Sequence, residues 1–347
     1  MENVNKCALC GMNKANKPNT HYLTDAIIKS AISVDEKNTR EKSSYYTMSS
    51  DKIGMLYGFQ RNTPQMVIER NLEREPTKEE IENAKKNPYS VDNVFCSDCE
   101  KLFTKIEESF VNDVLPKLRT QTQQKINALS LEECKTIRLF FILQCWRAHV
   151  CDSNFKLDAN VAEKFRQFIL NQEKASVDEL KQYPLSVTYI LTKEADCHTN
   201  HHIAVFSGCN PYLLIMNDFI IQLYDSPDKI RFDNLFGVNE NDYLNFINYD
   251  EESFQFKIIY QSQWEKIAIT IYREIFIPKI KATFCIECHN KLGILPDCSM
   301  IKEFLHYFEE NRRTLGFSEE DLMESIGNYL TSWEHNKERD GFDNFCR

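Results

Sequence analysis

The chain has 347 residues, of which 42% are hydrophobic, so it can bury the core of one large domain or of two smaller ones. Its 42 basic and 52 acidic residues leave a net charge of −10, which excludes a uniformly basic coat protein and leaves only a local basic surface for contact with nucleic acid. The 9 glycines include no GxG spacing, which excludes a dinucleotide-binding fingerprint and a Walker A loop.

The N-terminal segment 1–19 is polar, and charges or asparagines interrupt the most apolar stretches elsewhere. This pattern predicts a cytoplasmic protein with no secretion signal and no membrane contact. The chain has 13 cysteines, several of them in CxxC pairs. In a reducing compartment such pairs indicate metal binding rather than disulfide bonds.

Apolar spacing predicts an α+β fold that begins with short strands and amphipathic helices. The elements expected in the first half are a hairpin and a helix within 1–38, strands at 45–48 and 54–59, a helix from Thr77 to before Pro88, a helix from Glu100 to Pro116 and a helix over 131–150. Thr77 and Glu80 have the spacing of a capping box, and Pro116 has no N–H with which to continue a helix. The apolar faces of the last two helices predict that they pack together.

The second half is expected to form an antiparallel sheet with C-terminal helices. Predicted strands lie at 184–192, 202–207, 212–224 and 256–260, and predicted helices run from Ile267 to Pro278, from Ile301 to Phe308 and from Ser318 onward. Asn217 and Asp218 favour a turn that divides one apolar run into two strands. We therefore expect a metal-stabilised domain at 1–125 and an α+β accessory domain at 126–347 that senses a trigger, binds a partner or aligns a substrate.

Two CxxC pairs frame the N-terminal third of the chain. Cys7 and Cys10 form the first pair, and Cys96 and Cys99 form the second. Each pair presents two thiolates from one tight turn, and two such turns complete a closed tetrahedral Zn²⁺ site of the structural kind. The alternative is two unrelated pairs of reduced cysteines in a core.

The residues around these cysteines carry a more specific pattern. The chain reads CALCG at the first pair, Thr-His-Tyr-Leu-Thr-Asp from Thr20, and Val-Phe-Cys-Ser-Asp-Cys-Glu-Lys-Leu-Phe-Thr-Lys-Ile-Glu from Val94. Over residues 4–150 this order resembles bacterial HNH-like (His-Me finger) endonuclease domains. The resemblance implies a zinc-stabilised ββα-metal unit that hydrolyses phosphodiester bonds, with DNA favoured over RNA, as in bacterial defence against foreign DNA.

The resemblance also implies roles for individual residues. His21 matches the histidine that acts as general base, and Glu100 stands at the position of a metal ligand, where a carboxylate suits Mg²⁺ or Mn²⁺. Lys105 matches a lysine of the following helix and is expected to contact a phosphate. Thr20 stands where many of these enzymes carry a metal-binding aspartate, and Asp25 is the candidate that would replace it.

A second class of function stays open because of Thr20 and because the whole chain is acidic. It is a zinc-stabilised, non-catalytic binding or regulatory module. An activating protein is a further candidate partner of the nuclease.

Two other groups of metal-ligand residues occur. Cys285 and Cys288, followed by His289, form a third CxxC pair, which packs in a reduced helical core, forms its own zinc site, or replaces the second pair as partner of the first. His198 and His201 lie in a polar connection between two predicted strands, where solvated loop histidines are the alternative to a shared metal.

Overall fold

A computed structural model describes residues 5–32, 44–49, 54–59, 63–85, 89–120, 126–153, 155–191, 201–206, 211–230, 243–311 and 316–345. The elements in chain order are β1 (Thr20–His21), α1 (Asp25–Ile32), β2 (Ser44–Ser49), β3 (Met55–Phe59), α2 (Gln65–Leu72), α3 (Lys78–Asn83), β4 (Ser90–Val91), α4 (Ser97–Asp113), α5 (Leu115–Arg119), β5 (Ala128–Leu131), α6 (Cys134–Cys151), α7 (Ala159–Leu170), α8 (Val177–Lys181), β6 (Leu185–Leu191), β7 (His201–Phe206), β8 (Tyr212–Met216), β9 (Phe219–Leu223), the 3₁₀ turns η2 (Pro227–Lys229) and η3 (Tyr243–Phe246), β10 (Phe254–Tyr260), α9 (Gln261–Ile271), the π-helical turn η4 (Tyr272–Phe276), α10 (Ile277–Leu292), α11 (Cys298–Asn311) and α12 (Glu319–Phe345). The chain is therefore α+β, as expected.

A small two-stranded sheet lies near the N-terminus. β1 and β4 pair antiparallel, with Thr20 opposite Val91 and His21 opposite Ser90. α4 is the next element after β4 in the chain, so two short strands and one helix make up this unit. The segment before β1 is tied to this unit by backbone hydrogen bonds, including Ala8 N to Val94 O at 3.0 Å and Lys17 N to Phe95 O at 3.1 Å.

The large sheet has eight described strands in the order β3-β2-β7-β8-β9-β6-β10-β5. The expected turn at Asn217 and Asp218 is confirmed, since it joins β8 to β9 and Asn217 has a left-handed φ of 53°. The prediction of an antiparallel sheet for the second half of the chain is wrong at one pair, because β6 pairs parallel with β10; in addition, β2 joins this sheet and pairs parallel with β7. The partners in each parallel pair are far apart in the chain, β6 ending at Leu191 and β10 starting at Phe254, β2 ending at Ser49 and β7 starting at His201, and only a long connection allows neighbouring strands to run in the same direction.

The long segment between the two cysteine pairs contributes to this sheet. It supplies β2 and β3, which extend the sheet at the edge beside β7. A single hydrophobic cluster contains side chains from both sides of the expected domain boundary at 125/126, such as Phe103 and Phe256. The metal-stabilised unit and the large sheet thus share one core.

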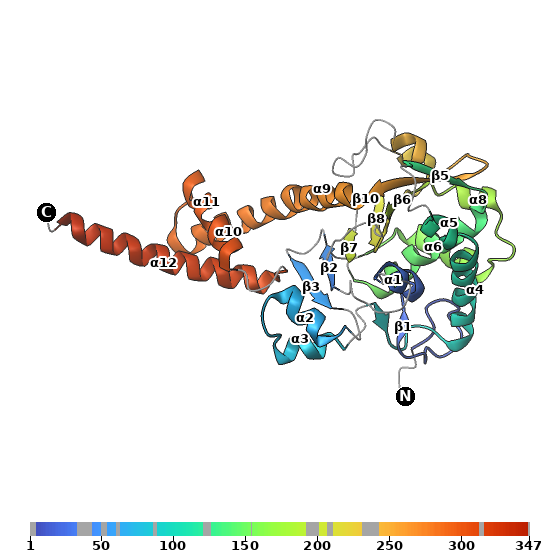
Figure 1. Ribbon diagram of the computed structural model, residues 1–347, viewed down its shortest axis with the longest axis horizontal. Coiled ribbons are helices and arrows are strands. Elements are labelled where there is room, and N and C mark those ends of the chain that lie inside the picture. The colour runs from blue at the N-terminus through green and yellow to red at the C-terminus, as the bar shows by residue number, and fades with distance from the viewer. Residues whose placement is uncertain are drawn as a thin grey trace.

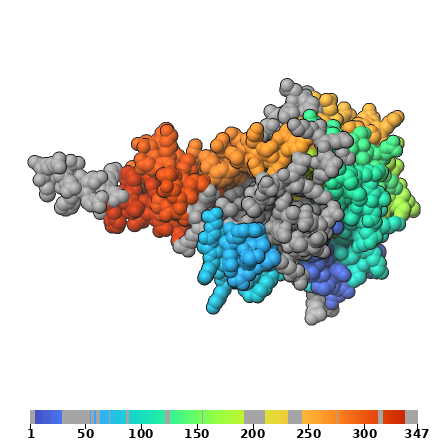
Figure 2. All heavy atoms as spheres, viewed as in Figure 1, coloured from blue at the N-terminus to red at the C-terminus, as the bar shows by residue number. Residues whose placement is uncertain are grey.

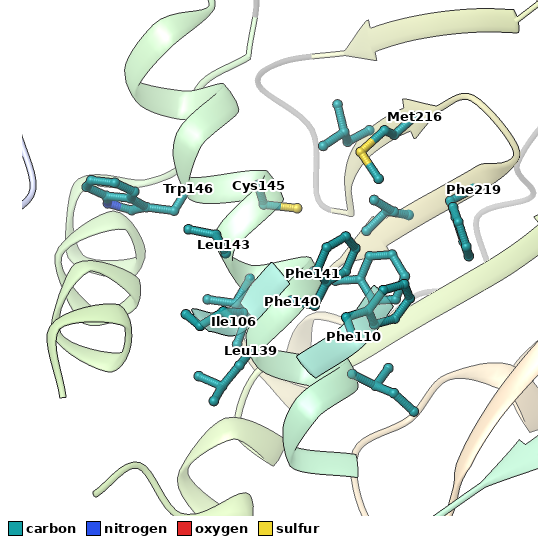
Figure 3. Close-up of a cluster of buried hydrophobic side chains, with 14 of the residues drawn as sticks. Ile106, Phe110, Leu139, Phe140, Phe141, Leu143, Cys145, Trp146, Met216 and Phe219 are labelled. Atoms are coloured by element: carbon teal, nitrogen blue, oxygen red, sulfur yellow. The ribbon is translucent and has the colours of Figure 1, made fainter. Parts of the chain in front are cut away.

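The two central helices, α4 and α6, pack against each other as the apolar spacing predicted. The rings of Phe110 and Phe140 stack with centroids 3.8 Å apart, and Phe141 meets Phe110 edge-on. Phe219 of β9 contacts both Phe110 and Phe141, so the helix pair lies on one face of the sheet (Figure 3). This packing fixes the position of α4 relative to α6.

The C-terminal helices form an arm that projects from the body (Figures 1 and 2). The prediction that a helix ends at Pro278 is wrong, because α9, η4 and α10 follow one another without a break. Pro278 lies in the first turn of α10, and the carbonyl four residues earlier belongs to the π-helical turn, which absorbs the irregularity that proline causes. Among the described residues, no helix combines the length and apolar character needed to cross a membrane.

Candidate metal centre and adjoining cavity

Four cysteines form the clearest site of the protein. The Sγ atoms of Cys7, Cys10, Cys96 and Cys99 all lie within 4.8 Å of one another. Zn–S bonds of about 2.3 Å in a tetrahedron place sulfurs about 3.8 Å apart, so this cluster fits one Zn²⁺. The two pairs that frame the N-terminal third therefore meet, as the sequence predicted.

Local backbone geometry brings the thiols together. The first pair lies in a tight turn in which Gly11 takes a left-handed φ of 68° and donates its N–H to Cys7 O at 2.8 Å. Cys96 is the N-cap residue of α4, and Cys99 lies in its first turn. The positive end of the helix dipole favours thiolates at these two positions.

The pKa values of two thiols in the cluster are shifted in opposite directions. Burial raises the pKa of Cys10, but backbone N–H groups of Asn13 and Met12 outweigh burial and hold the pKa at about 7. Burial and the neighbouring thiols raise the pKa of Cys99 well above its usual value. Four crowded thiols cannot all ionise without a compensating charge, and a bound Zn²⁺ supplies that charge.

A cavity of about 320 Å³ lies beside the cysteine cluster. β1 contributes Thr20 and His21 to its wall, and α4 contributes Glu100 and Glu107. Asp25, at the start of α1, also lines the cavity, and its Oδ1 lies 3.9 Å from His21 Nδ1. The two residues assigned to catalysis from the sequence, His21 and Glu100, are thus brought to one cavity.

Two oxygen atoms in this wall are buried without a hydrogen-bond partner among the described residues. They are Glu100 Oε1 and Thr20 Oγ1, and the whole Thr20 side chain is only 2% exposed. Burial raises the pKa of Glu100, while the charge of Arg147 and the nearby Thr20 hydroxyl oppose the rise. Buried polar atoms are rarely left unpaired, so this pair of oxygens is suited to an added ligand.

Arg147 is a cavity residue to which sequence reasoning assigned no role. Its guanidinium, 2% exposed, donates to His21 O at 3.0 Å, to Thr24 Oγ1 at 3.2 Å and to the Glu107 carboxylate. The Thr24 hydroxyl donates to Glu107 Oε1 at 2.6 Å. Arg147 therefore joins β1 and α4 to α6, and the signal that would have revealed it is a cation inside the buried apolar run of α6.

We expect Arg147→Met to lower the free energy of unfolding by about 3–5 kcal/mol, because the Glu107 carboxylate loses its buried counter-ion. Urea unfolding followed by circular dichroism measures the change. Lys101→Met is the matched control, since it removes the same charge from an exposed pair with Asp98 and is expected to cost under about 1 kcal/mol. Equal losses in the two variants would contradict the buried network.

Other residues named from the sequence lie elsewhere. Lys105 forms an ion pair with Glu173 on another face of α4 and does not line the His21 cavity, so its phosphate contact remains a prediction. Cys285 and Cys288 belong to helix α10, away from the four-cysteine cluster; Cys288 is buried in the core as expected, whereas Cys285 is only half-buried. His198 and the side chain of His201 lie outside the described residues.

Comparison of the chain with models of known protein families, with curated proteins and with solved structures gives no match.

Proposed function

We propose that the protein is a metal-dependent endonuclease of the HNH-like type that hydrolyses phosphodiester bonds of DNA. The observation that carries the proposal is the convergence of His21 and Glu100 on one cavity, beside a four-cysteine cluster that stabilises the same elements. The order of β1, β4 and α4 is the order of two strands and a helix that the resemblance implies.

The general base in this proposal is His21. Its imidazole takes a proton from the attacking water, which contributes about 10²–10⁴-fold to such reactions. The Asp25 carboxylate, 3.9 Å from His21 Nδ1, stabilises the imidazolium that forms. Arg147 holds the His21 carbonyl and so fixes the strand from which the imidazole projects.

The proposed ligands of Mg²⁺ or Mn²⁺ are the Glu100 carboxylate and the Thr20 hydroxyl. Their unpartnered oxygens fit a hard divalent cation, and a threonine hydroxyl binds Mg²⁺ in P-loop enzymes. When bound, such a cation would neutralise charge on the phosphate during cleavage. Threonine at position 20 thus keeps an oxygen ligand where related enzymes carry aspartate.

Cleavage of supercoiled plasmid in Mg²⁺ or Mn²⁺ tests the proposal. We expect nicked plasmid with the wild-type protein and none with Glu100→Gln, which keeps the size of the side chain and removes its charge. Glu173→Gln, purified identically, is the control for a carboxylate outside the cavity. Intact plasmid with zinc-loaded wild-type protein in both metals would count against the nuclease.

The raised pKa of Glu100 leads to a separate prediction about the pH dependence of Mn²⁺ binding. The pKa lies above its ordinary value of 4.5 because of burial, and a cation binds only the deprotonated carboxylate. We therefore expect Mn²⁺ affinity to rise as pH increases through this raised pKa, and Glu100→Gln to lose that part of the pH dependence. Electron paramagnetic resonance titrations of zinc-loaded wild-type and Glu100→Gln proteins measure it. Identical pH profiles for the two proteins would remove Glu100 from the site.

One observation favours the alternative of a zinc-stabilised binding module. Within the described ranges, no group of three histidine, cysteine or carboxylate side chains other than the four cysteines lies close enough to hold a metal. A module of this kind would bind zinc and a partner, and it would not bind Mn²⁺ at Glu100. The Mn²⁺ titration therefore separates the two functions.

A further inference from the structure

We propose that the segment 5–19, here called the basic knuckle, binds the phosphate backbone of a polynucleotide next to the His21 cavity. That the bound strand is then cleaved at the cavity rests on the proposed function. It concerns the lysines of this segment, to which neither the cysteine cluster nor the cavity assigns a role.

The charge of this segment is opposite to that of the protein. From Asn5 to Thr24 the chain contains no aspartate or glutamate, although 52 of its 347 residues are acidic. The same stretch carries Lys6, Lys14 and Lys17. In a protein with a net charge of −10, contact with nucleic acid requires such a local basic surface.

The fold places two of these lysines side by side. Lys6 and Lys14 are partners in an isolated antiparallel bridge, and both are exposed. Like charges directly opposite each other destabilise a pair of strands. A bound phosphate between the two ammonium groups would relieve this repulsion, so the arrangement suits an anionic ligand.

The third lysine lies beside the cavity. The backbone N–H of Lys17 donates to Phe95 O at 3.1 Å, just before α4, and Lys17 O accepts from the N–H of Asn93 at 2.9 Å. Two residues later the chain reaches Asn19, which lines the cavity together with the β1 residues that follow it. A strand bound along the knuckle is therefore led to His21.

The three lysines of the basic knuckle form no ion pairs with described carboxylates, unlike several other lysines of the protein. Lys101, Lys105 and Lys117 each form an ion pair with a carboxylate. None of the three knuckle lysines forms an ion pair with a described residue. Their charges thus remain available to an external anion, and Lys17 takes the phosphate-contacting position near the cavity that Lys105 does not occupy.

Binding of a fluorescent 20-base-pair DNA duplex tests the inference. Anisotropy is measured between about 50 and 200 mM salt without added divalent cation, so that no cleavage occurs. Each phosphate contact contributes about 0.9 to the slope of log affinity against log salt. We expect Lys6→Gln/Lys14→Gln/Lys17→Gln to weaken binding about tenfold or more and to lower the magnitude of this slope by about 2–3.

The matched control is Lys279→Gln/Lys281→Gln/Lys291→Gln on α10, which removes the same charge from the C-terminal arm. It is expected to leave the slope unchanged, and retained zinc shows that the variants are folded. Equal affinity and slope in the two triple variants, or no binding by wild type, would overturn the inference. Binding that depends on the knuckle without plasmid cleavage would instead refute the nuclease alone, and cleavage with an unaffected knuckle variant would refute the knuckle alone.

Discussion

Replacing His21 with alanine is expected to reduce plasmid cleavage by about 10²–10⁴-fold while the protein keeps its fold and its zinc. The imidazole lies at the rim of the cavity and is partly exposed, so its removal leaves no large void in the core. The bond between Arg147 and His21 uses the backbone carbonyl, which alanine retains. The loss should therefore appear in the rate of cleavage rather than in the free energy of unfolding.

Rates of nicking, zinc content and urea unfolding of the two proteins measure this prediction together. His306→Ala is the control, because His306 is an exposed histidine on α11 that pairs with Glu310. A His21→Ala protein that cleaves at the wild-type rate would remove His21 from the chemistry. If the wild-type protein does not cleave plasmid, the result contradicts the nuclease proposal and favours the binding module.

The second large effect is expected for Cys96→Ser, which should abolish zinc binding and unfold the N-terminal part of the chain. Zinc sites of this type contribute about 10–16 kcal/mol in small domains, and serine is a poor ligand for Zn²⁺. Cys96 occupies the N-cap position of α4, and Phe95 next to it packs against Phe103 and Trp146. Loss of the metal should therefore disturb the core that the knuckle and α4 share.

Metal analysis and thermal unfolding measure the effect of Cys96→Ser. Cys288→Ser is the matched control, since Cys288 is fully buried in α10 but outside the cluster, and its replacement should leave the zinc in place. A Cys96→Ser protein with wild-type zinc content and melting temperature would show that the four thiols do not share a metal.

Local structure was accessible from the sequence because its signals lie within a few residues. Thr77 and Glu80 form the expected capping box, with Glu80 N donating to Thr77 Oγ1 at 3.2 Å and Thr77 N donating to the Glu80 carboxylate at 2.8 Å. The turn at Asn217 needed only a residue that tolerates a left-handed backbone. The contact between the two cysteine pairs is a long-range feature that could nevertheless be predicted, because a tetrahedral Zn²⁺ site requires four ligands and each CxxC pair supplies two.

The sequence by itself thus predicted the two central helices, most strands of the large sheet, the pairing of the two CxxC motifs and the candidate residues His21 and Glu100, but not α2, α7, α8 or β5. Only the tertiary structure decided which strands pair in parallel, that β2 and β3 extend the large sheet, and that Arg147 reaches the cavity from α6. The physical reason is that strand order and the convergence of side chains depend on contacts between distant segments. Such contacts leave no periodic pattern in any one segment, whereas capping, turns and apolar spacing do.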